Sequence, residues 1–237
     1  MESKFDILIG ELFETIKDTG GAIKNVTDNE LFVAATSLFK FVDVGIKAKD
    51  LASQWKFEKF LKGFTATAPT EKQLKKLKKY IDSSIRAEFI ADTFKKVLLS
   101  NSSKACLIMG TILSEIVDNE KEITHKQLIC INALSQFYDI DLKNLVLLKD
   151  FSDTWVDDYR ISKTDSKLRV IANQYEVDFD GVLITLDKAV NLQLLKKSFK
   201  NIEIIMDVEY QKIEELYLFN FIGEELIRLI ERVEKMN

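Results

Sequence analysis

The scarcity of turn-forming residues is the feature that most constrains this chain, because its 237 residues include one proline and eight glycines. Glycine and proline supply most tight turns, so a sandwich or barrel of many short strands is disfavoured. Hydrophobic residues make up 46% of the chain, which is too apolar for a disordered protein. We therefore expect a mainly α fold with a substantial core.

Apolar residues recur at helical spacing from the start of the chain. Between Phe5 and Ile16 they fall at i, i+3, i+4, i+7, i+8 and i+11, and Gly20 and Gly21 follow as a stop signal. Capping residues are expected at Ser102 or Ser103, at Thr124 with Gln127, and at Asp141. Further helices are predicted at about 28–64, 71–81, 83–99, 103–117, 124–138 and 141–151.

Three regions are predicted from this pattern: N-terminal amphipathic helices over 1–64, a central helical bundle over 65–160 and a different kind of domain over 161–237. In the central region the helices at 105–117 and 127–137 are expected to approach each other closely, because both carry small residues. These residues are Ala105, Gly110, Ser114 and Ala133. Cys106 and Cys130 lie in apolar helical patterns and are interpreted as small core residues.

The last region changes its pattern from one segment to the next. A short helix is predicted at 167–175, and a compact apolar segment at 177–184 around the Asp180-Gly181 turn. Thr185 or Asp187 then starts a further helix, which is taken as 187–200. Two β-rich segments, 202–206 and 216–221, then flank a charged connection, and a last helix follows. Helix, short strand, helix, two-stranded ribbon and helix is the order of a winged-helix domain. The predicted fold is thus a helical bundle followed by a C-terminal winged-helix-like α+β domain with a small β-hairpin.

Two resemblances accompany this pattern. The segment LYLFNFIGEELIRLIERV resembles the second wing strand entering the final helix in many bacterial winged-helix proteins. The whole layout, with WKFEKFLKGF in the N-terminal part and SSKACLIMG in the middle, is similar to uncharacterised bacterial proteins with no assigned activity. The resemblance implies a bacterial or phage origin and assigns no site residues.

Residues that carry chemistry do not form a recognisable constellation. His125 is the only histidine, which excludes a metal site built on two imidazoles, and no glycine-rich phosphate loop is present. The densest carboxylates, from Asp153 to Asp158, match no calcium-loop or nuclease spacing and are interpreted as a solvated surface. We therefore predict no catalytic residues, cofactor or metal, and a protein that is not an enzyme.

The segment from Leu31 to Ile46 is apolar on nearly all sides. It is shorter than the roughly 20 apolar residues of a spanning helix and carries Lys40 and Asp43, so a core helix or a partner-binding helix is favoured. A membrane-acting effector is an alternative that rests on the same segment. The candidate partner-binding residues are Leu31, Phe32, Phe39, Phe41 and Trp55.

A DNA-binding role would depend on the predicted helix 187–200. Its candidate contacts are Lys188, Asn191, Lys196, Lys197 and Lys200. Residues 163–237 nevertheless carry 11 Lys and Arg against 14 Asp and Glu, whereas a DNA-docking face is normally basic. The leading hypothesis is a bacterial or phage interaction protein of regulation or phage defence, which binds a protein partner or itself. A DNA-binding transcriptional regulator is the alternative. The start of the chain does not read as a signal peptide, so a cytoplasmic location is expected.

Overall fold

The computed structural model describes residues 4–20, 48–65, 71–119, 122–156, 158–204 and 210–235. Most of these residues are helical, and one small antiparallel sheet of three strands accompanies the helices, which confirms the mainly α prediction. The chain divides into two compact units, one ending at Phe137 and the other running from Tyr138 to Lys235. This division lies between the boundaries predicted after residues 64 and 160. None of the described helices is long and apolar enough to cross a membrane.

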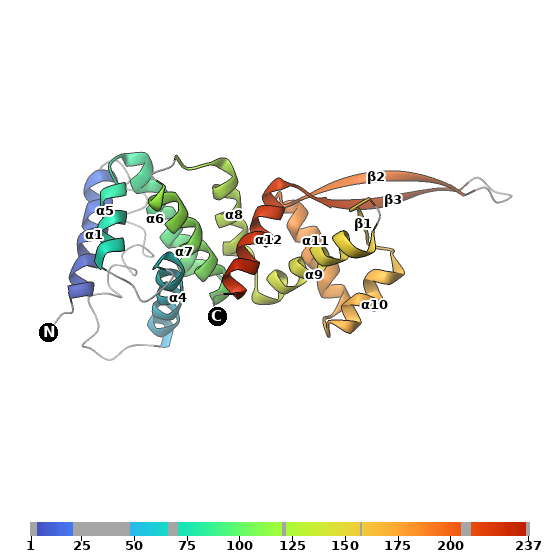
Figure 1. The fold of residues 1–237 in the computed structure, drawn as a ribbon, viewed down its shortest axis with the longest axis horizontal. Coiled ribbons are helices and arrows are strands. Elements are labelled where there is room, and N and C mark those ends of the chain that lie inside the picture. Colours follow the sequence, from blue (N-terminus) through green and yellow to red (C-terminus); the bar gives the residue numbers. More distant parts are fainter. Residues whose placement is uncertain are drawn as a thin grey trace. The chain divides into compact units, whose positions relative to one another are not determined.

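The first unit consists of helices packed on helices (Figure 1). Helix α1 packs on α5 and α6, and α4 lies along α7. The part of the predicted helix 28–64 that precedes α4 lies outside the described residues, as do Leu31, Phe32, Phe39 and Phe41. The elements are α1 (Lys4–Gly20), α4 (Ala48–Thr65), α5 (Glu71–Tyr80), α6 (Ser84–Leu99), α7 (Ser103–Asp118) and α8 (His125–Gln136).

Two of the predicted helix caps are present. Ser102 Oγ accepts a hydrogen bond from the amide of Ala105 at 2.8 Å, and Thr124 forms a capping box with Gln127. Asp141, by contrast, is not a cap residue. It lies in the first turn of its helix, where its carboxylate accepts from the amide of Tyr138 at 2.9 Å.

Aromatic rings and a close backbone contact join α4 to its neighbours. Phe57 and Phe60 of α4 each meet the ring of Phe94 on α6 edge to face, with ring centres 5.2 and 5.6 Å apart. A Cβ on Gly110 would stand 2.0 Å from the carbonyl oxygen of Phe60. Gly110 therefore permits the contact of α7 with α4, and the expectation that it serves the approach of α7 to α8 was wrong. Cys106 and Cys130 are buried thiols in the core of the first unit, as predicted.

The second unit combines helices with a long β-ribbon (Figure 1). Strand β3 is central in the order β1-β3-β2, and it pairs with β2 from Leu195↔Phe219 to Ile204↔Tyr210. The last helix is present where the sequence predicted it. The elements are α9 (Asp139–Trp155), β1 (Ile161–Ser162), α10 (Ser166–Gln174), α11 (Phe179–Asn191), β2 (Leu195–Ile204), β3 (Tyr210–Phe219) and α12 (Phe221–Glu234).

The short strand predicted within 177–184 was wrong, because α11 begins there instead. Asp178 is the N-cap of α11, and its Oδ2 accepts a hydrogen bond from the amide of Gly181 at 2.9 Å. The Asp180-Gly181 pair thus opens a helix rather than forming a turn. The short strand of this unit is β1, whose two residues pair with Tyr217 and Leu216 of β3.

The helix predicted over 187–200 was also wrong in its second half. The chain leaves α11 at Leu192, and Gln193 adopts a left-handed conformation with φ of 62°. The amide of Gln193 then donates to Val190 and that of Leu194 to Ala189, which is the Schellman pattern of a helix end. Glycine usually occupies this left-handed position, so a glutamine gave no stop signal in the sequence.

Candidate interaction surface on helix α11

The exposed face of α11 is formed by Asp180, Ile184, Asp187 and Asn191, at spacings i, i+4, i+7 and i+11. We call these four residues the α11 stripe. All four are exposed, and Ile184 keeps 65% of its accessible surface. The stripe therefore presents a branched apolar side chain between two carboxylates. The opposite side of the helix is buried and consists of Val182, Thr185, Leu186 and Ala189.

Lys188, the only lysine of α11, points towards α9. Its Nζ donates to Asp141 Oδ2 at 2.7 Å and lies 5.0 Å from the centre of the Tyr138 ring. Asp141 is almost buried and also accepts a hydrogen bond from Thr185 Oγ1 at 2.9 Å. A carboxylate removed from water needs such partners, so the Lys188 ammonium group stabilises the contact between α9 and α11.

The five candidate DNA contacts do not share one helix face. Lys188 and Asn191 lie on α11, whereas Lys196, Lys197 and Lys200 lie on β2. Because side chains alternate along a strand, Lys196 and Lys200 share one side of the ribbon and Lys197 takes the other. The predicted lysine face is thus divided among a helix and two sides of a strand.

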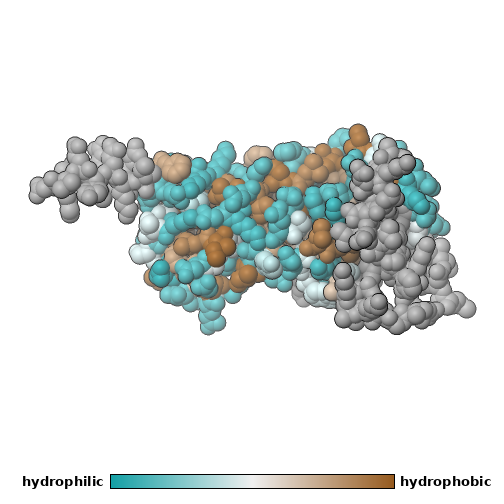
Figure 2. All heavy atoms as spheres, turned by 180° about the vertical axis from the view of Figure 1, so that it is seen from behind, coloured by the Kyte–Doolittle hydropathy of each residue, from teal (hydrophilic) through white to brown (hydrophobic). Residues whose placement is uncertain are grey.

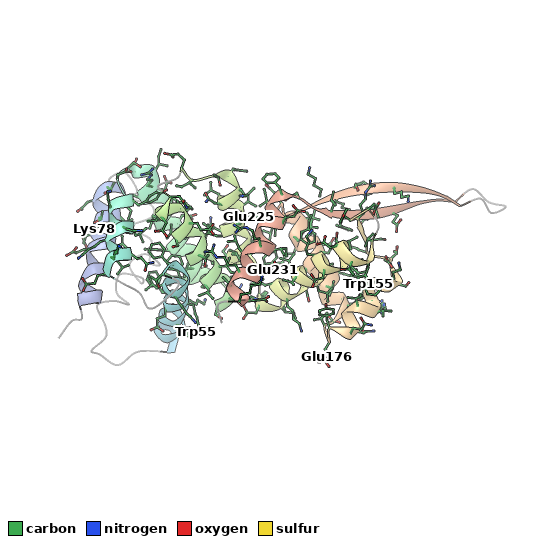
Figure 3. The ribbon with its side chains drawn as sticks, in the orientation of Figure 1. Trp55, Lys78, Trp155, Glu176, Glu225 and Glu231 are labelled. Atoms are coloured by element: carbon green, nitrogen blue, oxygen red, sulfur yellow. The ribbon has the colours of Figure 1, made fainter. Side chains whose placement is uncertain are left out.

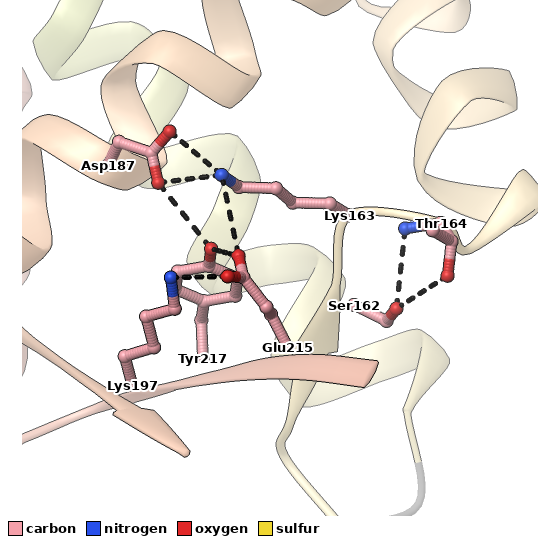
Figure 4. A network of polar contacts seen from close by, with 7 residues as sticks. All are labelled: Ser162, Lys163, Thr164, Asp187, Lys197, Glu215 and Tyr217. Carbon is pink, nitrogen blue, oxygen red and sulfur yellow. Dashed lines mark hydrogen bonds and ion pairs between the residues drawn. The ribbon is translucent and has the colours of Figure 1, made fainter. Parts of the chain in front are cut away.

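A polar network joins the ribbon to α11 (Figure 4). Lys163 Nζ contacts both carboxylate oxygens of Asp187, at 2.7 and 2.8 Å, and the Tyr217 hydroxyl donates to Glu215 Oε2 at 2.6 Å. Burial and the hydrogen bond to Glu215 raise the pKa of Tyr217 well above its usual value. Hydrogen bonds from Lys197 and Tyr217 lower the pKa of Glu215. A neutral phenol therefore donates to an ionised carboxylate at the base of the ribbon.

Sequence reasoning did not identify this network, since its members come from four separate segments. Lys197 and Tyr217 are register partners across β2 and β3, so they share a face, and Glu215 lies on that face two residues along β3. The register itself could not be read from the sequence. An alternating Glu215-x-Tyr217 pattern was the only signal available.

Acidic side chains also surround the N-terminal end of α11. Asp178 caps the helix, Asp180 lies in its first turn, and Glu176 belongs to the turn after α10, where Figure 3 labels it. The guanidinium group of Arg169 lies 4.3 Å from the centre of the Phe179 ring. Carboxylates therefore occupy the end of the helix whose amides and dipole would otherwise favour a phosphate.

The first unit offers a more isolated candidate in Trp55, which projects from α4 (Figure 3). Half of its surface is exposed, and Lys59 Nζ lies 5.7 Å from the centre of its ring. Two lysines of α5 pair with neighbouring helices: Lys76 with Asp118 of α7 at 2.8 Å and Lys78 with Glu11 of α1 at 2.9 Å. These partly exposed ion pairs join α5 to its neighbours in the first unit.

On the face seen in Figure 2, hydrophobic residues form several separate patches between hydrophilic ones. The described residues of that face therefore present no single extended apolar area. Within the described ranges, no group of three or more His, Cys, Asp or Glu side chains is placed to hold a metal ion. His125 is the first residue of α8, next to its cap.

The chain was compared with known proteins in three ways. No family model matches it, no curated protein matches it, and no solved structure matches it.

Proposed function

We propose that the second unit is a winged-helix module in which α11 occupies the position of the recognition helix. The succession α9, β1, α10, α11, β2 and β3 supports this assignment, as does the strand order β1-β3-β2. In this assignment α10 and α11 are the two helices of a helix-turn-helix, and the β-ribbon that follows them is the wing. Fold alone does not give function, so what the module binds depends on the side chains exposed on α11.

We propose further that the protein acts by binding another protein through this module. The observation that carries the proposal is the α11 stripe, with exposed Ile184 between Asp180 and Asp187 while Lys188 is paired with Asp141. A helix that reads DNA would instead present basic and amide side chains to the groove. Residues 138–237 carry 14 Lys and Arg against 20 Asp and Glu, which also opposes binding to phosphates.

A DNA-binding regulator is the second candidate, favoured by one observation. Lys196 and Lys200 are exposed on the same side of β2, where a wing would meet a phosphate backbone. A Lys196→Glu, Lys200→Glu variant tests this candidate. If DNA binding exists and uses the wing, the variant should lose affinity and its salt dependence should be shallower.

The deciding experiment measures both candidates on the full chain. Fluorescence anisotropy with a labelled mixed-sequence duplex at about 50 mM salt, where phosphate contacts are strongest, should show no saturable binding. Affinity purification from the host after exhaustive nuclease treatment should retain a protein in stoichiometric amount. Saturable DNA binding that the Lys196→Glu, Lys200→Glu variant abolishes, together with no retained protein, would reverse the proposal.

A further inference from the structure

We infer that the partner of the α11 stripe is a positively charged helix that places an apolar side chain on Ile184 and cationic side chains against Asp180 and Asp187. The inference rests on the proposed function and adds to it the chemistry of the partner that binds the stripe. It starts from three exposed residues in a row along α11, one apolar and two acidic.

The stripe favours side-chain contact over strand addition. The amides and carbonyls of the helix interior are bonded within α11, so an added strand would find no main-chain partners there. Another helix can pack its side chains along such a surface, with anchors on successive turns. The stripe runs along the helix for about three turns, which is a length that a single partner helix can follow.

The charge of the α11 stripe determines the sign of the charge on the partner helix. Asp180 and Asp187 are both exposed, and the only lysine of α11 is paired with Asp141. Asp187 also forms an ion pair with Lys163, but half of the Asp187 side chain remains accessible. An acidic helix would meet like charges on both sides of Ile184, whereas lysine or arginine side chains would meet opposite ones.

The spacing of the residues in the α11 stripe predicts a sequence pattern for the partner helix. Asp180 and Asp187 are seven residues apart, which is about 10.5 Å along the helix axis, and Ile184 lies between them. A partner helix that follows the stripe would match it with two cationic residues seven positions apart. One Leu, Ile, Met or Phe would stand three or four positions from either of them, because those positions share one helix face.

The experiment selects helices against the intact protein. A phage-displayed library of a soluble helical scaffold, randomised on one face, is selected on the full chain, and the binders are then tested on Ile184→Glu. Binders that lose at least about tenfold in affinity on this variant should carry the seven-residue pair of Lys or Arg around an apolar residue. Val170→Glu, an exposed apolar position on α10, is the matched control and should leave their affinity unchanged.

Charge reversal provides the second test. Asp180→Lys should lower the affinity of the selected binders about tenfold or more. A binder whose matching lysine is replaced by glutamate should regain affinity for the Asp180→Lys variant but not for the wild type. Circular dichroism and thermal unfolding of each variant establish that the fold is retained.

The inference is overturned if binders sensitive to Ile184→Glu carry acidic or uncharged patterns, or if every selected binder ignores Ile184→Glu and Asp180→Lys. These outcomes differ from failure of the proposed function. A protein retained from the host with equal yield by wild type and Ile184→Glu would still support protein binding as the function, but would remove the α11 stripe as the interface.

Discussion

Gly110 of α7 faces the main chain of Phe60 on α4 so closely that a Cβ on Gly110 would stand 2.0 Å from the Phe60 carbonyl oxygen. Gly63 of α4 has the reciprocal relation to Leu107 of α7, at 1.9 Å. The obstructing atoms belong to backbones, which cannot rotate away as a side chain would. The two helices therefore hold this spacing only with glycine at both positions.

Gly110→Ala and Gly63→Ala should each destabilise the first unit by about 1–3 kcal/mol or more, since an added methyl group forces the helices apart. Gly10→Ala on α1 is the control, because nothing lies within 4 Å of its added Cβ. That substitution should stabilise by up to about 1 kcal/mol. Urea unfolding in a Trp155→Phe background, where Trp55 of α4 reports the first unit, measures these differences. Equal stability of all three variants would contradict the close helix contact.

Lys188→Met should cost more stability than Asp141→Asn. Removal of the lysine leaves the nearly buried carboxylate of Asp141 without its cation, for which about 2–3 kcal/mol is expected, less than for a fully buried pair because Lys188 is a quarter exposed. The Asp141→Asn side chain keeps one oxygen that can accept from the Tyr138 amide, and its NH2 group can donate to Thr185 Oγ1, whose hydroxyl still donates to the Gly181 carbonyl oxygen. Lys188 can turn to water in this variant, so about 1 kcal/mol is expected. Unfolding followed through Trp155 in a Trp55→Phe background gives both values. The reverse order would show that the pair is not the main interaction of Asp141.

Tyr217 should ionise at higher pH than an ordinary tyrosine. Burial and its hydrogen bond to Glu215 raise its pKa, and burial also raises the pKa of Tyr80. The ultraviolet absorbance of tyrosinate should thus show a late fraction that Tyr217→Phe reduces. Loss of only an early fraction in Tyr217→Phe would contradict the network of Figure 4.

The same group makes stability depend on alkaline pH. Because the folded pKa of Tyr217 exceeds the unfolded value near 10, its contribution is complete below that value. The contribution is lost as pH rises towards the folded pKa, since the unfolded chain releases the proton first. Tyr217→Phe should therefore show a shallower loss of stability in the alkaline range, which chemical denaturation at a series of pH values measures.

Asp150→Asn should stabilise the second unit at neutral pH. Burial, and then the negative charges of Glu231, Asp153 and Glu234, raise the pKa of Asp150, so its ionised form is unfavourable in the folded state. The group is largely exposed, which limits the expected gain to about a few tenths of a kcal/mol, and added salt should reduce it. The wild type should gain the same stability as pH falls through the raised pKa. Glu224→Gln is the control, because the Glu224 carboxylate lies 3.6 Å from Lys149 Nζ. This variant should show no gain in stability.

Local signals in the sequence were sufficient for most helices. The apolar stripe of residues 5–16, the Ser102 cap and the Thr124 capping box act within about three turns of chain or less, so they could be recognised without the tertiary structure. The final helix was equally clear, because Leu226, Ile230 and Val233 form one buried face. The two-residue strand β1 had no such signal, since its pairing with β3 involves residues more than 50 positions away.

One helix end shows where local signals failed. Gln193 adopts a left-handed conformation that glycine usually supplies, and it ends α11 through Schellman hydrogen bonds. The predicted helix therefore ran from Asp187 to Lys200. Lys196, Lys197 and Lys200, which lie on β2, were assigned to it. That error produced the single basic face that the structure divides.

The sequence by itself determined the helical class, most helix positions, the buried cysteines and the acidic balance of the last region, because composition and short-range periodicity are properties of neighbouring residues. Only the tertiary structure decided that Lys188 is held by Asp141, that Gly110 meets Phe60, and that Asp180, Ile184 and Asp187 remain exposed. These relations join residues about 50 positions apart or depend on which side of a helix is covered. Packing sets them, and the pattern along the chain is compatible with more than one packing.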